Sequence, residues 1–149
     1  MNNFLMVIHV NPVINNFNNN FNTRSNDDDD IENFFHGNIP AVADPNMNID
    51  NCISILGNFD PNRFMNAFIE KIQKIDNDDN YTVASEQELK FRFEILNDDK
   101  ENNIRLEMTI TLYQSNNGHI LQFVRNEGTI NDFNHYVQMF SEFARNLLE

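Results

Sequence analysis

Histidine and cysteine are the residues of this sequence best suited to catalysis or to binding a transition metal. The four histidines, His9, His36, His119 and His135, show none of the paired spacings, such as HxH or HExxH, that bring two imidazoles to one metal. Cys52 is the single cysteine, and it stands in the apolar stretch CISIL without a local signature of a catalytic thiol. We therefore predict no metal site, and we expect the histidines on the surface or in a hairpin and Cys52 packed in the interior.

The acidic turn DNDDN at residues 76–80 begins like the calcium loop of an EF-hand. Asp76, Asp78 and Asn80 occupy the first, third and fifth positions of such a loop. The sixth position is Tyr81 in place of glycine, and the twelfth is Gln87 in place of glutamate. Because the ligand set is incomplete, we interpret this segment as the turn that ends a helix.

Motifs of the common catalytic classes are missing from the sequence. It contains no glycine-rich phosphate loop, no GxSxG elbow and no kinase catalytic signature. The acidic run at residues 27–30 could attract Ca²⁺ or a basic partner, but four like charges without turn geometry are typical of a solvated tail. We predict that the protein is not an enzyme and needs no cofactor.

Four basic residues remain as candidates for contact with a partner or a lipid: Arg125, Lys90, Arg92 and Arg105. Arg125 ends a predicted strand, where its alternative role is a salt bridge or a cap at the edge of a sheet. The alternation of polar and apolar residues puts the other three on the outer face of the predicted sheet, together with Glu94 and Glu107. Cross-strand ion pairs would account for these three without any ligand.

The charge of the chain limits the classes of partner. The sequence has 149 residues, the size of one domain, and a formal net charge of -13. Residues 58–149 alone carry nine Lys and Arg against sixteen Asp and Glu. Because recognition of phosphates depends on clustered Lys and Arg, we predict no nucleic-acid binding, and the acidic charge disfavours attachment to a membrane surface.

The cysteine content and the N-terminus indicate the compartment. One cysteine cannot form an internal disulfide, and the start of the sequence lacks the basic and long apolar regions of a secretion signal. No apolar run approaches the length of a membrane span, and the mean hydropathy is -0.54. We expect a cytoplasmic protein with no disulfide-linked partner.

Hydrophobic periodicity and capping residues define the elements expected between residues 58 and 149. Asp60 and Pro61 begin a helix that runs to about Ile75 with apolar residues three and four positions apart. Alternating polar and apolar residues then predict strands at 81–84, 89–95, 104–112 and 119–125. A second amphipathic helix follows Gly128, with Thr129 or Asn131 as its N-cap, and covers residues 131–148.

This order, α-β-β-β-β-α, predicts an α+β domain at 58–149: a four-stranded antiparallel sheet with both helices packed on one face. Residues 1–57 contain one basic residue against seven acidic ones, and we expect a mostly disordered, low-complexity Asn/Asp-rich tail. Two apolar pieces of that tail, residues 4–10 and 31–42, are exceptions. Disorder, docking on the domain (for 4–10, as a short strand) and binding to a partner remain open for both.

Several segments resemble the kinase-associated 1 (KA1) domain found at the C-terminus of MARK/Par-1 and SNF1/AMP-activated kinases. They are the helix FDPNRFMNAFIEKIQKI, the strands LKFRFEI and IRLEMTITLY, and the C-terminal stretch HILQFVRNEGTINDFNHYVQMFSEFARNLL. In that family a strand ending in a basic residue passes through a small turn containing glycine into the last amphipathic helix. Arg125, Gly128 and Phe133 match this pattern, and the resemblance covers residues 60–148.

The resemblance implies a non-catalytic interaction or regulatory domain that binds a protein partner or restrains a kinase domain. Some family members bind anionic phospholipid through basic residues at the last strand, where this chain keeps Arg125 but has Gln122 and Val124. The alternatives are a small subunit of a multiprotein assembly that shares only the helix-sheet-helix fold, and a phospholipid-binding module for membrane targeting. Whether the chain is free-standing or part of a kinase stays open.

Overall fold

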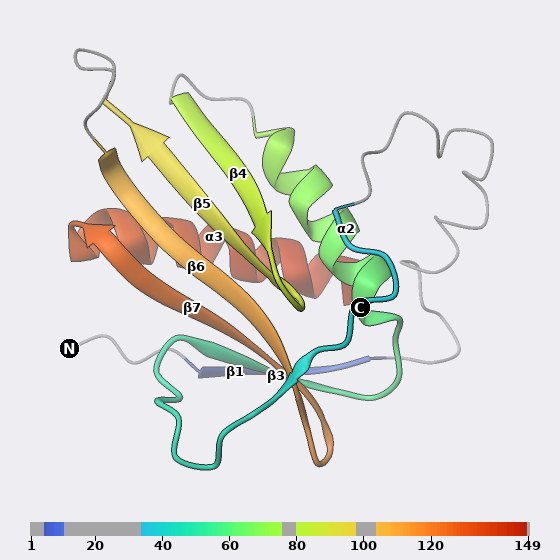
Figure 1. Cartoon of the computed structure of the whole chain (residues 1–149). Helices are drawn as coiled ribbons and strands as arrows, with labels where there is room; N and C mark the ends of the chain where they lie inside the picture. The colour runs from blue at the N-terminus through green and yellow to red at the C-terminus, as the bar shows by residue number, and fades with distance from the viewer. Residues whose placement is uncertain (1–4, 11–33, 76–79, 98–103, 149) are drawn as a thin grey trace.

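The computed structural model describes residues 5–10, 34–75, 80–97 and 104–148, and these residues form an α+β fold (Figure 1). In chain order its elements are β1 (Leu5–His9), β2 (Ala41–Val42), β3 (Cys52–Leu56), α2 (Pro61–Gln73), β4 (Asn80–Glu86), β5 (Lys90–Leu96), β6 (Ile104–Ser115), β7 (Gly118–Gly128) and α3 (Ile130–Leu148).

The strands form one sheet in the order β1-β3-β7-β6-β5-β4, and β2 pairs with the end of β6. Strands β4 to β7 make an antiparallel meander, β3 runs antiparallel to β7, and β1 and β2 pair in parallel with β3 and β6. The predicted sheet of four strands was therefore wrong in its size. The additional strands come from the first 57 residues, where the apolar run CISIL forms β3.

Two pieces of the segment expected to be a tail belong to this fold. β1 lies within residues 4–10 and buries Ile8. β3 lies between β1 and β7, and its Ile53 and Ile55 are completely buried. Phe35, from residues 31–42, is also buried. In the described residues, position 57 thus does not separate a tail from a domain. Residues 11–33, which account for most of the expected disorder, lie outside the described residues.

The alternation of residue types explains the meander. In β5, Phe91, Phe93 and Ile95 are completely buried, and the polar residues between them are partly exposed. Phe91 pairs with Ile110 and Phe93 with Met108 on β6, so apolar side chains of neighbouring strands share one face.

Local hydrogen bonds begin the two helices where the sequence predicts. The carboxylate of Asp60 accepts hydrogen bonds from the backbone N–H groups of Asn62 and Arg63, so Asp60 caps α2. The Oγ1 atom of Thr129 accepts the N–H of Asp132 at 3.1 Å and caps α3 in the same way. Both helices therefore start at fixed positions relative to the strands that precede them.

The two helices take different positions on the twisted sheet. α3 runs behind the meander in Figure 1, and its backbone approaches β7, β6 and β1. α2 stands beside β4, at the edge of the sheet, and its backbone packs chiefly against α3. The prediction that both helices lie on one face of the sheet was therefore wrong. The twist of the enlarged sheet turns β1 and β3 across the direction of β4, so no single flat face serves both helices.

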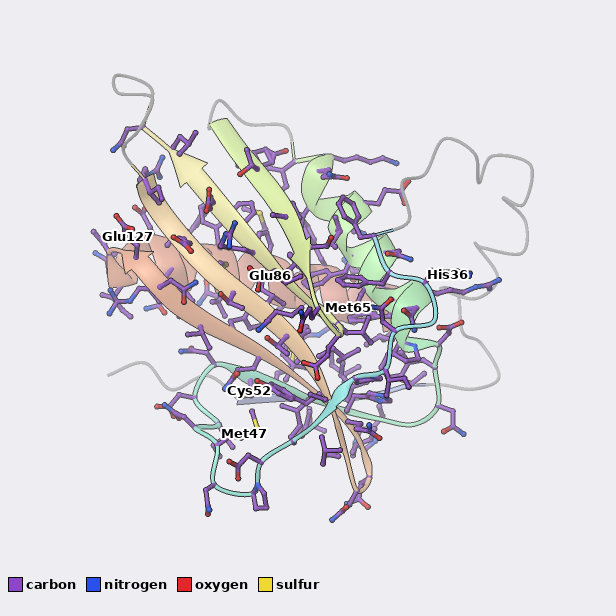
Figure 2. The ribbon with its side chains drawn as sticks, viewed as in Figure 1. His36, Met47, Cys52, Met65, Glu86 and Glu127 are labelled. Atoms are coloured by element: carbon purple, nitrogen blue, oxygen red, sulfur yellow. The ribbon has the colours of Figure 1, made fainter. Side chains whose placement is uncertain are left out.

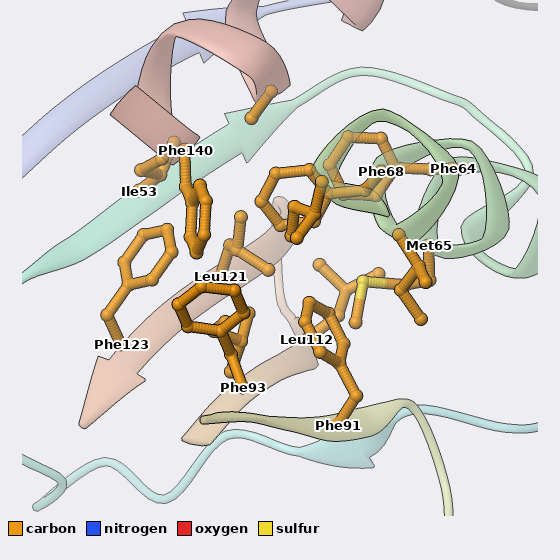
Figure 3. Close-up of a cluster of buried hydrophobic side chains, with 14 of the residues drawn as sticks. Ile53, Phe64, Met65, Phe68, Phe91, Phe93, Leu112, Leu121, Phe123 and Phe140 are labelled. Atoms are coloured by element: carbon orange, nitrogen blue, oxygen red, sulfur yellow. The ribbon is translucent and has the colours of Figure 1, made fainter. Parts of the chain in front are cut away.

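Aromatic rings fill the core between the helices and the sheet (Figure 3). Phe68 of α2 packs edge-on against Phe91 of β5, with ring centroids 5.9 Å apart, and against Phe140 of α3 at 6.1 Å. Phe140 also packs edge-on against Phe93 at 5.1 Å. These contacts connect α2, α3 and β5 through a single cluster.

Candidate functional site

Arg92 and Lys90 of β5 belong to an ion-pair network on the outer face of the sheet. The guanidinium of Arg92 lies 2.8 Å from a carboxylate oxygen of Glu86, 3.0 Å from one of Glu94 and 3.8 Å from one of Glu107. The Nζ atom of Lys90 lies 3.8 Å from the other oxygen of Glu86. Three carboxylates thus face two cations, so the described part of this face presents no basic cluster.

Arg105, at the start of β6, binds an acidic residue of α3. Its Nε lies 3.3 Å from Oδ2 of Asp132, and its Nη2 donates to Oδ1 at 3.4 Å. This pair ties the first turn of α3 to the sheet. The alternation along the strands predicts a cross-strand pair for Arg105 but does not predict this contact with the helix.

Arg125 differs from the other three basic candidates. It lies on the exposed part of β7, and its Nη1 donates to the backbone oxygen of Gly128 at 2.7 Å, which stabilises the turn into α3. Within the described ranges, no carboxylate lies within ion-pair distance of its guanidinium. Arg125 therefore keeps donors that can reach a ligand.

Arg125 lines a solvent-open pocket of about 360 Å³ where β7, the first turn of α3 and the turn before β3 meet. We call its lining residues the junction surface: Asn48, Asp50, Asn51, Gln122, Phe123, Val124, Arg125, Ile130 and Phe133. Val124 is 40% exposed and Ile130 is 44% exposed. Figure 2 shows Glu127 at the end of β7 and Met47 in the loop that leads to β3. The junction surface thus combines an arginine with apolar side chains open to solvent.

Backbone and side-chain hydrogen bonds hold the turn of the junction surface in place. The side chain of Gln122 donates to the backbone oxygen of Asn48 at 3.0 Å, and the N–H of Phe123 donates to the backbone oxygen of Asn51 at 3.0 Å. Asn51 has a φ of 59°, in the left-handed region that asparagine tolerates. Its buried Oδ1 has no hydrogen-bond partner among the residues that the structure describes. Asn48, Asn51 and Ile130 were not predicted as site residues, because no local pattern of residues indicates that this turn pairs with β7.

Burial shifts the pKa values of two side chains, Cys52 and His119. Burial, together with the charge of Asp50, raises the pKa of Cys52 to about 11, so the thiol stays protonated near neutral pH. Burial lowers the pKa of His119, whose ring packs on Phe59 with centroids 4.7 Å apart. Both side chains therefore contribute to packing. Cys52 is buried in the apolar stretch CISIL, and His119 follows the hairpin turn between β6 and β7.

Residues 5–10, 34–75, 80–97 and 104–148 carry neither a metal-binding cluster nor a membrane-spanning helix. Within these ranges no group of three or more His, Cys, Asp or Glu residues is arranged to hold a metal ion. The helices found there are too short or too polar to cross a membrane. The acidic runs at 27–30 and 76–79 lie outside the described residues.

Comparison with known proteins gave no relative. No protein-family model, no curated protein and no solved structure matches this chain.

Proposed function

We propose that the chain is a non-catalytic interaction domain of the KA1 type that binds a protein partner through the junction surface. The order α2, β4, β5, β6, β7, α3 supports the resemblance, because it is the order of helix, four antiparallel strands and helix on which the resemblance rests. The motif residues lie around the junction of the last strand and the last helix. Arg125 lies three residues before the end of β7, Gly128 is the last residue of β7, and Phe133 is buried in α3.

The observation that carries this proposal is the composition of the junction surface. Arg125 has no acidic partner within the described residues, and Val124 and Ile130 expose 40% and 44% of their surface beside it. Arginine and apolar residues are enriched in the centres of protein interfaces, where they supply much of the binding energy. The partner would place an acidic residue on Arg125 and an apolar side chain against Val124 and Ile130.

The pairing of the other basic residues favours a protein partner over anionic phospholipid. A basic residue near an anionic membrane contributes about 1 kcal/mol, so attachment by charge needs a cluster of several. Lys90, Arg92 and Arg105 are each matched with carboxylates, and Arg125 remains as a single cation beside the exposed Glu127. A kinase domain, in this protein or another, and a subunit of a larger assembly are both partners of the proposed kind.

Affinity purification with matched variants tests the proposal. The full-length protein would be tagged and purified from the cells that make it, as wild type, as Val124→Glu and as the control Gln73→Glu, which adds the same charge at an exposed position of α2. We expect a defined set of proteins to copurify with the wild type and the control, and to fall at least tenfold with Val124→Glu. Arg125→Glu and Ile130→Glu should lose the same proteins.

Circular dichroism would first establish that each variant is folded. A folded Val124→Glu that retains the full set of copurifying proteins would refute the junction surface as the binding site.

A further inference from the structure

Residues 34–43, which we call the strap, cross the front of α2 and reach β6 (Figure 1). Two asparagines of α2, four residues apart on one helix face, bind the backbone of the strap. The side chain of Asn66 accepts the N–H of Phe35 and donates to its carbonyl oxygen, both at 2.8 Å. The side chain of Asn62 does the same for Asn38, with both distances 2.9 Å.

The end of the strap binds β6 through its backbone as well. Ala41 and Val42 pair in parallel with Tyr113 and Gln114, beyond Thr111, which pairs with the first residue of β5. The side chain of Gln114 donates to the carbonyl oxygen of Pro40 at 2.8 Å, and its backbone oxygen accepts the N–H of Ala43 at 2.8 Å. This addition of a short strand to a free sheet edge is the way many domains bind extended peptides.

The side chains of the strap contribute one deep anchor. Phe35 is 2% exposed and belongs to the core, whereas Ile39 and Val42 are 74% and 73% exposed. Gly37 has a φ of 67°, which bends the strap between its two asparagine contacts. Phe34 also packs against the core but is only partly buried. A segment with one fully buried ring opens more readily than the strands beneath it.

We propose that the groove between α2 and β6, defined by Asn62, Asn66 and Gln114, is a peptide-binding site. The strap occupies this groove in cis, and an extended segment of a protein partner with a phenylalanine anchor takes its place when the strap opens. The amides of the three residues contact backbone atoms, so they accept many sequences, and the Phe35 site selects an aromatic residue. Proline is tolerated five positions after the anchor. The hydrogen bond from Gln114 goes to the carbonyl oxygen of Pro40 and needs no backbone N–H at that position.

When the strap leaves, the groove loses the hydrogen bonds of its amide side chains and the ring that fills its apolar site. With the strap in place Asn66 is 5% exposed, and its donor and acceptor are both paired with Phe35. Removal of the strap takes away both partners, and an occupant with an extended backbone restores them. The space left by Phe35 would be apolar and ring-sized. The groove is separate from the junction surface. Gln114 pairs with His119 near the start of β7, whereas Arg125 of the junction surface lies near the end of that strand.

A peptide of residues 34–43, labelled with a fluorophore and followed by anisotropy, tests the groove directly. The full chain would be compared as wild type, as Phe35→Ala and as the control Ile39→Ala, which alters an exposed side chain of the strap. Phe35→Ala removes the anchor in cis and leaves its site for the peptide. We expect it to bind the peptide at least tenfold more tightly than the wild type and the control.

Two further changes identify the contacts in the same measurement. The peptide with alanine at the position of Phe35 should not bind, and Phe35→Ala combined with Asn66→Ala should lose at least tenfold in affinity. If the folded Phe35→Ala variant does not bind the peptide, or binds it no more tightly than the wild type does, the proposal is overturned.

Hydrogen exchange of the wild type covers the case in which Phe35→Ala does not fold. We expect the amides of Phe35, Asn38 and Ala43 to exchange at least a hundredfold faster than those of β5 and β6, because the strap opens without global unfolding. Equal rates would make the strap a fixed part of the core and would refute an exchangeable site.

Discussion

At the residue scale, the arginines show how neighbours decide what one side chain can do. Arg92 and Arg125 are both partly open to solvent on the sheet, yet Arg92 is shared by three carboxylates while Arg125 donates to one backbone carbonyl. Counting charges along the sequence assigns both to a surface without distinguishing them. Alternation along the strands predicts Glu94 and Glu107 on the face of Arg92, whereas Glu86 of β4 comes to Arg92 through the strand register alone.

Cys52 gives a prediction about stability at alkaline pH. The folded protein holds the proton of this thiol up to a pKa of about 11, against 9.0 for an unperturbed thiol. Between these values the folded state binds more protons than the unfolded state, so the free energy of unfolding falls as pH rises, by at most about 1.4 kcal/mol per pH unit.

Urea denaturation of the wild type and Cys52→Ala between pH 8 and 11 measures this contribution. The stability difference between the two should shrink above pH 9 as the wild type loses the contribution of its protonated thiol. A difference that stays constant with pH would contradict the burial of the thiol.

At the scale of elements, the sequence predicts what is local. The alternation in β5 and β6 and the caps Asp60 and Thr129 lie within a few residues of the elements that they define. β3 was missed because its five residues follow an acidic, Asn-rich stretch, and its stability comes from β7 and from β1, far away in sequence. The placement of α2 depends on the twist of the whole sheet, and so does the meeting of turn, strand and helix at the junction surface.

Gly128 offers a test of the connection between β7 and α3. It has a φ of 111°, and a Cβ added there would lie 2.5 Å from the carbonyl oxygen of Arg105. Gly128→Ala should therefore combine a strained backbone with a clash against β6 and lower the free energy of unfolding by about 2–4 kcal/mol.

Gly37→Ala is the matched control for this variant. Gly37 also has a positive φ, of 67°, but a Cβ there meets no atom within 4 Å, so the substitution should cost about 1 kcal/mol. Chemical denaturation compares the two, and an equal loss in both variants would contradict the close packing of Gly128 on β6.

At the scale of the whole molecule, the formal net charge of -13 opposes attachment to anionic membranes. We expect no appreciable sedimentation of the full chain with phosphatidylserine-rich vesicles at about 0.15 M salt, a concentration that screens exposed charges beyond about 8 Å. Uncharged phosphatidylcholine vesicles are the control. Strong binding to the anionic vesicles that Arg125→Glu abolishes would instead assign the junction surface to phospholipid.

Photo-crosslinking in the cells that make the protein tests most directly whether the junction surface contacts a protein partner. A photoreactive phenylalanine derivative would replace Ile130 at the exposed start of α3, or Gln73 at the exposed end of α2 as the control. We predict a discrete crosslinked species of higher mass from position 130, identifiable by mass spectrometry, and none of that mass from position 73. No crosslinked protein at position 130, or the same species from both positions, would contradict a partner at the junction surface.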